Sequence, residues 1–252
     1  MRRHRRRVTP ARALLAALIP AQIAYGRLPG RRSPAATRGL VWLLLSVSAA
    51  EAIESRGLRR GGVPVAVAGA LGFLVELAGV ATGRPFGHYS YSEQLGRRVG
   101  GVPLLAAAAW ALMARPAWVT AGHATRRASW LRVPAAAAAL TAWDVFLDPR
   151  MAREGYWSWP AGGRYEGIPA SNFAGWLATG TLVYAAWLAL DADREPDAAD
   201  DGALVLYVWT WIGETFANAA LWKRPVTAAA GGVAMGAFAV PALLERAGTR
   251  RP

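Results

Sequence analysis

The chain has 252 residues, of which 54% are hydrophobic, and its formal net charge is +13 at pH 7. The apolar residues gather in blocks of about 15–20, the length of a helix that crosses a bilayer, so the composition argues against an ordinary soluble domain. The arginines lie mostly between these blocks and form no continuous basic stripe, which argues against nucleic acid as a partner. The absence of cysteine excludes disulfides, thiolate catalysis and iron–sulfur clusters.

The apolar blocks predict an all-α protein, a polytopic bundle of seven or eight transmembrane helices in a single membrane domain over residues 1–252. The first two blocks are short, which leaves the count open between seven and eight. We also expect a basic N-terminal tail at 1–10, a flexible acidic loop at 191–202 and a C-terminal tail at 245–252. The expected spans are Ala11–Tyr25, Leu40–Ile53, Val63–Thr82, Val102–Thr120, Val133–Leu147, Ser171–Leu190, Ala203–Trp222 and Val226–Leu244.

The N-terminus is rich in arginine, with a cluster between Arg2 and Arg7, and this predicts that it lies in the cytoplasm. No small-residue cleavage site precedes the arginines that resume at Arg27, so an uncleaved helix is favoured over a signal peptide. We therefore expect an integral protein of a prokaryotic plasma membrane, with the lipid bilayer as a partner.

Ionisable side chains interrupt several of the expected spans. Such a group indicates a functional site, because its unpaired burial in a membrane is costly. Glu76 lies within the third span, where the alternative to a functional role is an ion pair with Arg84. Glu214 and Asn218 lie four residues apart in the seventh span and therefore share a helix face.

Other charged residues are expected to be structural. Glu51 and Glu54 end the second block and are followed by arginines with which they can pair. The segment 114–132 is predicted to be a solvated basic loop that contains Arg115 and His123. We assign no chemistry to this loop, and three scattered histidines cannot build a His-rich metal site.

The segment 143–176 combines acids, aromatic residues and turn residues between two apolar blocks. Asp144 and Asp148 lie four residues apart and share a helix face, and Pro149 predicts that the helix ends at Asp148. Asn172 begins the next span, either as a helix cap or as part of a site. The aromatic residues of the segment that can line a site are Trp143, Tyr156, Trp157 and Trp159.

Because antiparallel spans alternate in direction, the loops 83–101 and 148–170 are predicted to share one face of the membrane. Tyr89 and Tyr91 lie in the first of these loops, either as part of an interfacial aromatic belt or as a second lid of the site. Glu76, Asp144 and Glu214 lie toward the same face on three spans, and Asn172 begins a fourth span there. Acids that converge at one depth predict a buried site with a proton donor, because removal from water favours the neutral form of a carboxyl group.

Three blocks carry a resemblance to a known family: RPFGHYSYSEQLGRRVGGVP at 84–103, WDVFLDPRMAREGYWSWPAGGRYEGIPASNFAGW at 143–176 and WTWIGETFANAALW at 209–222. From about Val63 to its C-terminus the chain resembles the integral-membrane carotenoid biosynthesis proteins. Within these it is similar to the carotenoid 1,2-hydratases of the γ-carotene and bisanhydrobacterioruberin hydratase type. The resemblance implies addition of water across a terminal isoprenoid double bond, which gives a tertiary alcohol without any cofactor or metal.

The residues suit this chemistry. We expect Asp144 to protonate the alkene, with Glu214 as the second candidate, while Asp148, Glu76 and Asn172 position water or tune the acid. Aromatic faces would stabilise the tertiary cation, and the hydrophobic polyene substrate would enter from the lipid. The side chains expected to contact substrate are Trp143, Tyr156, Trp157, Trp159, Asn172, Tyr89, Tyr91, Trp211 and Asn218.

Two other functions remain open. The spacing of Asp144 and Asp148 also suits a Mg²⁺-dependent prenyl diphosphate enzyme, although the other acid-rich run, 191–201, is predicted on the opposite face. A non-enzymatic lipid carrier or scaffold is the second alternative, because transporters also carry intramembrane acids. Other carotenoid pathway enzymes are candidate partners.

Overall fold

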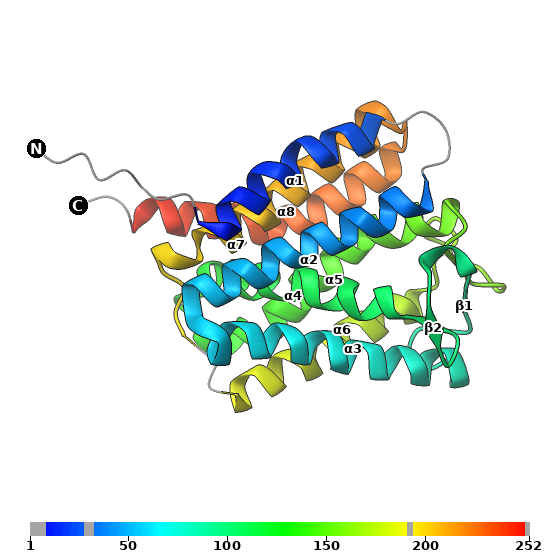
Figure 1. Ribbon diagram of the computed structural model, residues 1–252, viewed down its shortest axis with the longest axis horizontal. Coiled ribbons are helices and arrows are strands. Elements are labelled where there is room, and N and C mark those ends of the chain that lie inside the picture. Colours follow the sequence, from blue (N-terminus) through cyan, green and yellow to red (C-terminus); the bar gives the residue numbers. More distant parts are fainter. Residues whose placement is uncertain (1–8, 28–32, 191–193, 250–252) are drawn as a thin grey trace, which may run out of the picture.

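The structure, a computed structural model, describes residues 9–27, 33–190 and 194–249. They form an antiparallel bundle of helices, with very short strands in the loops at one end (Figure 1). Each predicted span is helical, so the all-α class is confirmed; most of the predicted basic tail and the end of the C-terminal tail lie outside the described residues. The helices are α1 (Pro10–Arg27), α2 (Pro34–Gly57), α3 (Val63–Thr82), α4 (Leu104–Ala124), α5 (Arg132–Arg153), α6 (Ala170–Ala189), α7 (Asp201–Phe216) and α8 (Pro225–Gly248).

Shorter elements connect these helices. Two strand pairs are antiparallel, β1 with β4 and β2 with β3. Two π-helical segments follow α2 and α7, and three-residue 3-10 turns lie in three of the loops. Their bounds are β1 (Ser90–Tyr91), β2 (Arg98–Val99), β3 (Val102–Pro103), β4 (Trp157–Ser158), η1 (Leu58–Gly62), η2 (Glu93–Leu95), η3 (Ser129–Leu131), η4 (Ala198–Asp200) and η5 (Ala217–Leu221).

Three stretches of the described chain are long and apolar enough to cross a membrane: Pro34–Thr82, Leu104–Ala124 and Pro225–Gly248. The first contains both α2 and α3, which run in opposite directions on either side of η1 (Figure 1). These helices support membrane association, but a count of seven or eight spans is not confirmed. α7, for example, has 16 residues, fewer than the roughly 20 of a typical span.

The start and end of several helices follow from local sequence. Pro34 and Pro225 stand at the starts of α2 and α8, where proline's missing N–H costs nothing. Gly83 ends α3 in the left-handed conformation, with φ of 75°, and its N–H donates to the carbonyl of Gly79 at 2.7 Å. This cap turns the chain into the loop that carries Tyr89 and Tyr91.

α5 continues through Pro149 to Arg153, so the prediction that this helix ends at Asp148 is wrong. A proline inside a helix frees the carbonyl four residues earlier, here that of Val145. The hydroxyl of Tyr165 donates to this carbonyl at 2.9 Å. A distant loop residue thus replaces the lost N–H, and Asp144 and Asp148 lie on consecutive turns of one helix.

α4 forms the centre of the bundle, packed against α2, α3, α5, α7 and α8 and buried along most of its length. The prediction of a solvated loop at 114–132 is therefore wrong for its first half, which is helical. Arg115 is 5% exposed and His123 is 1% exposed. The burial of Arg115 is compensated, because its Nε donates to Glu51 Oε2 at 3.1 Å and its Nη2 pairs with Asp200.

Glu51 therefore pairs with Arg115 of another helix. The prediction that it pairs with the arginines that follow it in sequence is wrong. Arg56 pairs instead with Asp200, across 144 positions of sequence. We call Glu51, Arg56, Arg115 and Asp200 the arginine cluster; it lies toward the end of the bundle where α2 stops and α7 begins. Residues 191–193 of the predicted acidic loop lie outside the described residues, whereas Asp200 and the adjacent Asp201 are ion-paired.

Candidate active site

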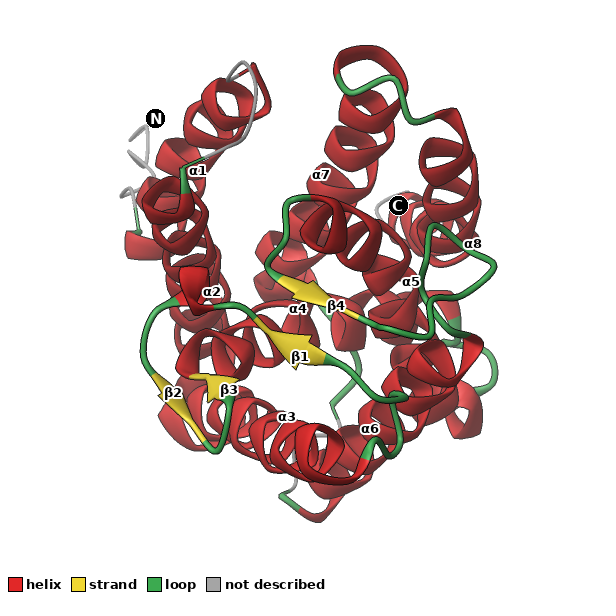
Figure 2. Cartoon of the chain, turned by 90° about the vertical axis from the view of Figure 1, so that its right-hand side faces the viewer, coloured by secondary structure: helices red, strands yellow, loops and turns green. Residues whose placement is uncertain are grey.

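The two aromatic loops meet at one end of the bundle, as the alternation of helix directions predicted. β1 of the first loop pairs with β4 of the second, in the register Ser90 with Ser158 and Tyr91 with Trp157. Figure 2 shows the two strands side by side across this end. Loops 83–101 and 148–170 therefore lie at the same end of the bundle.

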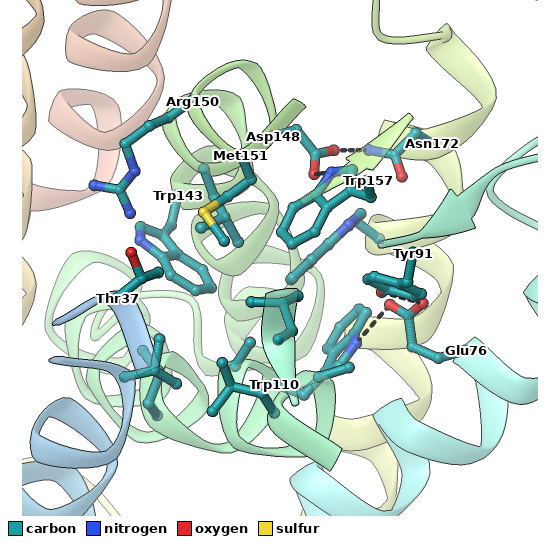
Figure 3. Close-up of a pocket in the computed structure, with 18 of the residues that line it drawn as sticks. Thr37, Glu76, Tyr91, Trp110, Trp143, Asp148, Arg150, Met151, Trp157 and Asn172 are labelled. Carbon is teal, nitrogen blue, oxygen red and sulfur yellow. Dashed lines mark hydrogen bonds between the residues drawn. The ribbon is translucent and has the colours of Figure 1, made fainter. Parts of the chain in front are cut away.

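Beneath these strands lies a narrow cavity with a volume of about 70 Å³. Side chains of α1 to α6 and of both loops line it, and most are aliphatic or aromatic. The polar groups on its walls are few, and two of them are carboxyl groups from different helices, Glu76 of α3 and Asp148 of α5 (Figure 3). An apolar cavity with a small number of placed polar groups is the usual form of a small-molecule site.

Asp148 belongs to a buried pair of carboxyl groups. The amide Nδ2 of Asn172 donates to Asp144 Oδ2 at 3.0 Å and also to Asp148 Oδ2. The indole Nε1 of Trp157 donates to Asp148 Oδ1 at 3.1 Å. Asp148 faces the cavity, whereas Asp144 is fully buried behind it and its Oδ1 has no partner among the described residues.

Glu76 is the second buried carboxyl group at the cavity. Its Oε2 accepts from the hydroxyls of Tyr89 and, at 2.8 Å, of Tyr91, and its Oε1 accepts from the indole of Trp110 at 3.1 Å. Within the described part of the chain Glu76 has no ion pair, and so the alternative of a salt bridge to Arg84 does not occur. All three donors are neutral side chains.

The pairing of β1 with β4 links the two carboxyl groups. Tyr91, which binds Glu76, lies directly opposite Trp157, which binds Asp148. Their rings meet edge to face, with centroids 5.6 Å apart. A two-residue ladder thus places the donors of both acids side by side in the roof of the cavity.

The tyrosines of this roof are held as neutral hydrogen-bond donors. Burial and the nearby Glu76 carboxylate raise the pKa of the Tyr91 hydroxyl well above its ordinary value, and the same two causes raise the pKa of Tyr89. Neither tyrosine therefore ionises near neutral pH. They can orient a carboxyl group or a bound water but do not act as bases there.

The indoles of Trp110 and Trp176 form a floor that sequence reasoning did not find. They stack with centroids 3.9 Å apart, and Trp143 meets Trp176 edge to face at 6.1 Å. Trp110 reaches Glu76 because Gly72, one turn earlier on α3, leaves room: a Cβ there would lie 2.1 Å from the indole. A glycine four residues before an intramembrane acid was the available signal for this contact.

The structure brings most of the predicted site residues together and places others elsewhere. Tyr156 is buried outside the lining, and its hydroxyl lies 2.7 Å from that of Thr37, a lining residue. Trp211 donates to the carbonyl of Gly232 between α7 and α8. The predicted residues that do line the cavity are Glu76, Tyr89, Tyr91, Trp143, Asp148, Trp157, Trp159 and Asn172.

Glu214 lies at the same end of the bundle but outside this cavity. It pairs with Arg150 at 2.9 Å, and the Nδ2 of Asn218 donates to its backbone carbonyl at 2.9 Å. Arg150 lines the cavity with Asp148, so its side chain separates Glu214 from the other acids. The direction of the seventh helix was predicted correctly, but its acid faces another space.

Over residues 9–27, 33–190 and 194–249, no group of three or more His, Asp or Glu side chains is placed to hold a metal ion. Neither a curated protein nor a solved structure matches the chain. The family of carotenoid biosynthesis proteins matches over residues 38–238, a range that contains both carboxyl groups and both aromatic loops. The chain thus belongs to the carotenoid biosynthesis protein family and has a role in carotenoid biosynthesis.

Proposed function

We propose that the protein is a carotenoid 1,2-hydratase, which adds water across a terminal isoprenoid double bond of an acyclic or monocyclic carotenoid. The observation that carries the proposal is the placing of two carboxyl groups, Glu76 and Asp148, in one apolar, aromatic-walled cavity, where among the described residues each accepts hydrogen bonds from neutral donors alone. Acid-catalysed hydration of an alkene requires a proton donor, a stabilised cation and a placed water. The cavity supplies a side chain for each of these requirements.

We assign proton donation to Asp148, because it faces the cavity, and the role of its partner to Asp144 behind it. Two carboxyl groups that share the amide of Asn172 and have no ion pair among the described residues repel each other if both are charged. The pair therefore holds one proton between them. That proton passes from Asp148 to the less substituted alkene carbon, and the π electrons form the new C–H bond.

Protonation leaves a tertiary cation in the cavity. Aromatic faces such as those of Trp157 and Trp143 attract it, and the Glu76 carboxylate supplies a negative charge close by. Water then forms the C–O bond, and its proton returns to the carboxylate of Asp148. The product is a tertiary alcohol, the acid is regenerated, and no electron is exchanged with a cofactor.

The geometry favours this reaction over the diphosphate alternative. The described part of the second acidic run, residues 194–201, would have to face Asp144 and Asp148 across a metal, but it lies at the other end of the bundle. There Asp200 binds Arg56 and Arg115, and Asp201 binds Arg246. Activity that persists in the presence of a chelator would support the hydratase.

The direct test is expression of the chain in a host that accumulates acyclic or monocyclic carotenoids. We expect pigments heavier by one water, with the new hydroxyl on the tertiary carbon of the end group. Oxygen from labelled water should appear in the product, because the mechanism takes its oxygen from water. Folded protein in the membrane without any hydrated product, over several such substrates, would contradict the proposal.

A further inference from the structure

A second cavity lies between α1 and α7, which stand apart in the end-on view (Figure 2). It has a volume of about 330 Å³. Two indoles connect its walls: Trp209 donates to Gln22 Oε1 at 2.5 Å, and Trp222 donates to the carbonyl of Gly26 at 3.1 Å. Helix α1 packs mainly against α2 and only weakly against α7, which leaves the space between α1 and α7 loosely packed.

The mouth of this cavity is apolar on the outside of the bundle. Four of its lining side chains are also among the exposed large apolar residues of the protein, with exposed fractions of 41% to 61%. They come from α1, α7 and η5. An opening rimmed in this way faces lipid and not water, because exposed apolar patches of this kind are unfavourable in water. These residues are Ile23, Ile212, Phe216 and Leu221.

The two cavities share a wall. Tyr25, Leu40 and Arg150 line both of them. Arg150 lies on the side of the first cavity away from Glu76 (Figure 3), and its Nη1 binds Glu214 in the second. Tyr25 and Arg150 therefore stand between the two cavities, and a long, thin molecule that reached from the two acids to the mouth between α1 and α7 would pass Arg150.

We propose that the second cavity binds the polyene chain beyond its reacting end, so that the substrate enters sideways from the bilayer between α1 and α7. This inference rests on the proposed hydratase function and adds a binding site for the distal chain. An extended isoprenoid chain suits the mostly apolar lining of the second cavity, which shares Tyr25 and Leu40 with the first. Arg150, held by Glu214, keeps its charge at the edge of the path and leaves the apolar walls to the polyene.

Gly213 of α7 allows a sharp test. It lines the second cavity, and a Cβ added there meets nothing within 4 Å, so a larger side chain can occupy the cavity without displacing a neighbour. The variant Gly213→Phe should block the distal chain, with Gly213→Leu as a milder block. The matched control is Gly39→Phe, at a site inside α2 that also has open space and lines neither cavity.

The readout is hydration of two substrates with the same end group, an acyclic carotenoid and an acyclic isoprenoid hydrocarbon of about half its length. We expect Gly213→Phe to lower product from the carotenoid by about tenfold or more, since pocket contacts of this size discriminate on that scale. Gly213→Leu should lower it less, and the short substrate should be hydrated as in the control. The amount of each variant in the membrane normalises the comparison.

Equal hydration of the carotenoid by Gly213→Phe and Gly39→Phe would overturn this inference alone. A loss of equal size on both substrates would also overturn it, and would indicate that the substitution impairs the reaction site itself. If the wild-type chain gives no hydrated product from both substrates, the proposed function is overturned, and this inference with it.

Discussion

Toward the end of the bundle where α7 begins, the buried carboxylates Glu51 and Asp200 face arginines, whereas the two carboxyl groups that line the cavity beneath the paired strands face asparagine, tyrosine and tryptophan. Glu51 and Asp200 both bind Arg115. Asp148 and Glu76 accept only from amide, indole and phenol groups among the described residues. The same residue types are thus buried in two chemically different surroundings within one protein.

The difference separates structural acids from chemical ones. A carboxylate bound to arginines stays ionised and fixes helices to one another, since removing either partner leaves an unpaired buried charge. A carboxyl group held by neutral donors beside an apolar cavity can take up or release a proton without losing its position. The first arrangement therefore suits stability, and the second suits the proposed proton transfer.

The largest expected effect separates two aspartates by function. Asp148→Asn should lower hydration by about 100-fold or more, because it removes the proposed general acid. Asp200→Asn is the matched control: both residues are almost fully buried, at opposite ends of the bundle. Product formation per folded molecule should be near normal in Asp200→Asn, measured by pigment analysis. Unchanged hydration in Asp148→Asn would remove Asp148 from the mechanism.

The next effect concerns stability at the arginine cluster. Arg115→Met removes the cation that pairs with Glu51 and with Asp200 Oδ1. The buried charge left unpaired should lower the free energy of unfolding by about 3–5 kcal/mol. Arg98→Met is the control, because Arg98 pairs with Glu93, an exposed residue, and such pairs contribute about 0–1 kcal/mol. Denaturant unfolding of the purified protein in detergent compares them. Similar losses in both variants would show that the buried cluster contributes no more than a surface pair.

A smaller effect tests how α5 passes Pro149 and keeps Asp148 at the cavity. Tyr165→Phe removes the donor to the Val145 carbonyl and should cost about 1 kcal/mol. In the control, Tyr207→Phe, the affected carbonyl of Ala139 keeps its own helical partner, so the loss should be smaller. Thermal unfolding of the two variants side by side gives the difference. If Tyr207→Phe lowers the unfolding temperature more than Tyr165→Phe does, the hydrogen bond from Tyr165 to the Val145 carbonyl does not compensate for the N–H that Pro149 lacks.

The smallest effect is a pH dependence confined to the arginine cluster. Although burial opposes ionisation, the hydrogen bond from Arg56 and the charge of Arg115 lower the pKa of Asp200 below its ordinary value of 3.8. Between the lowered pKa of folded Asp200 and 3.8, the unfolded chain binds more protons than the folded protein. The contribution of Asp200 to the free energy of unfolding is therefore complete above pH 3.8 and is lost as the pH falls through the pKa of the folded state. In Asp200→Asn the free energy of unfolding, measured by denaturant unfolding, should fall less steeply with decreasing pH below pH 3.8 than it does in the wild type. An identical acid slope in variant and wild type would assign the loss to other groups.

Much of the fold could be predicted because apolar length and alternation are local properties. Each apolar block became a helix, and the alternation of directions placed both aromatic loops at one end, where Tyr91 meets Trp157. The acids Glu76, Asp144 and Glu214 were likewise assigned to the correct half of their helices. These predictions require only helix geometry and the order of the segments.

The partner of each buried charge could not be predicted, because it depends on how a helix is rotated against its neighbours. Spacing alone placed Asp144 and Asp148 on one face of α5, but packing against α6 decides that Asp148 reaches the cavity while Asp144 lies behind it. Similarly, Glu214 faces Arg150 in the second cavity and not the other acids. Glu51 finds its cation 64 residues away, on α4, and not in the arginines beside it.

The sequence by itself thus determined the helices, their directions and the end of the bundle at which acids and aromatic residues gather, since these follow from hydrophobic length and chain order. Only the tertiary structure decided which acids meet neutral donors and which meet arginines, because a side chain's partners depend on helix rotation and on contacts between distant segments. The continuation of α5 past Pro149 is the clearest case. There the hydroxyl of Tyr165, from a loop 20 residues away in sequence, donates to the Val145 carbonyl that Pro149 leaves free.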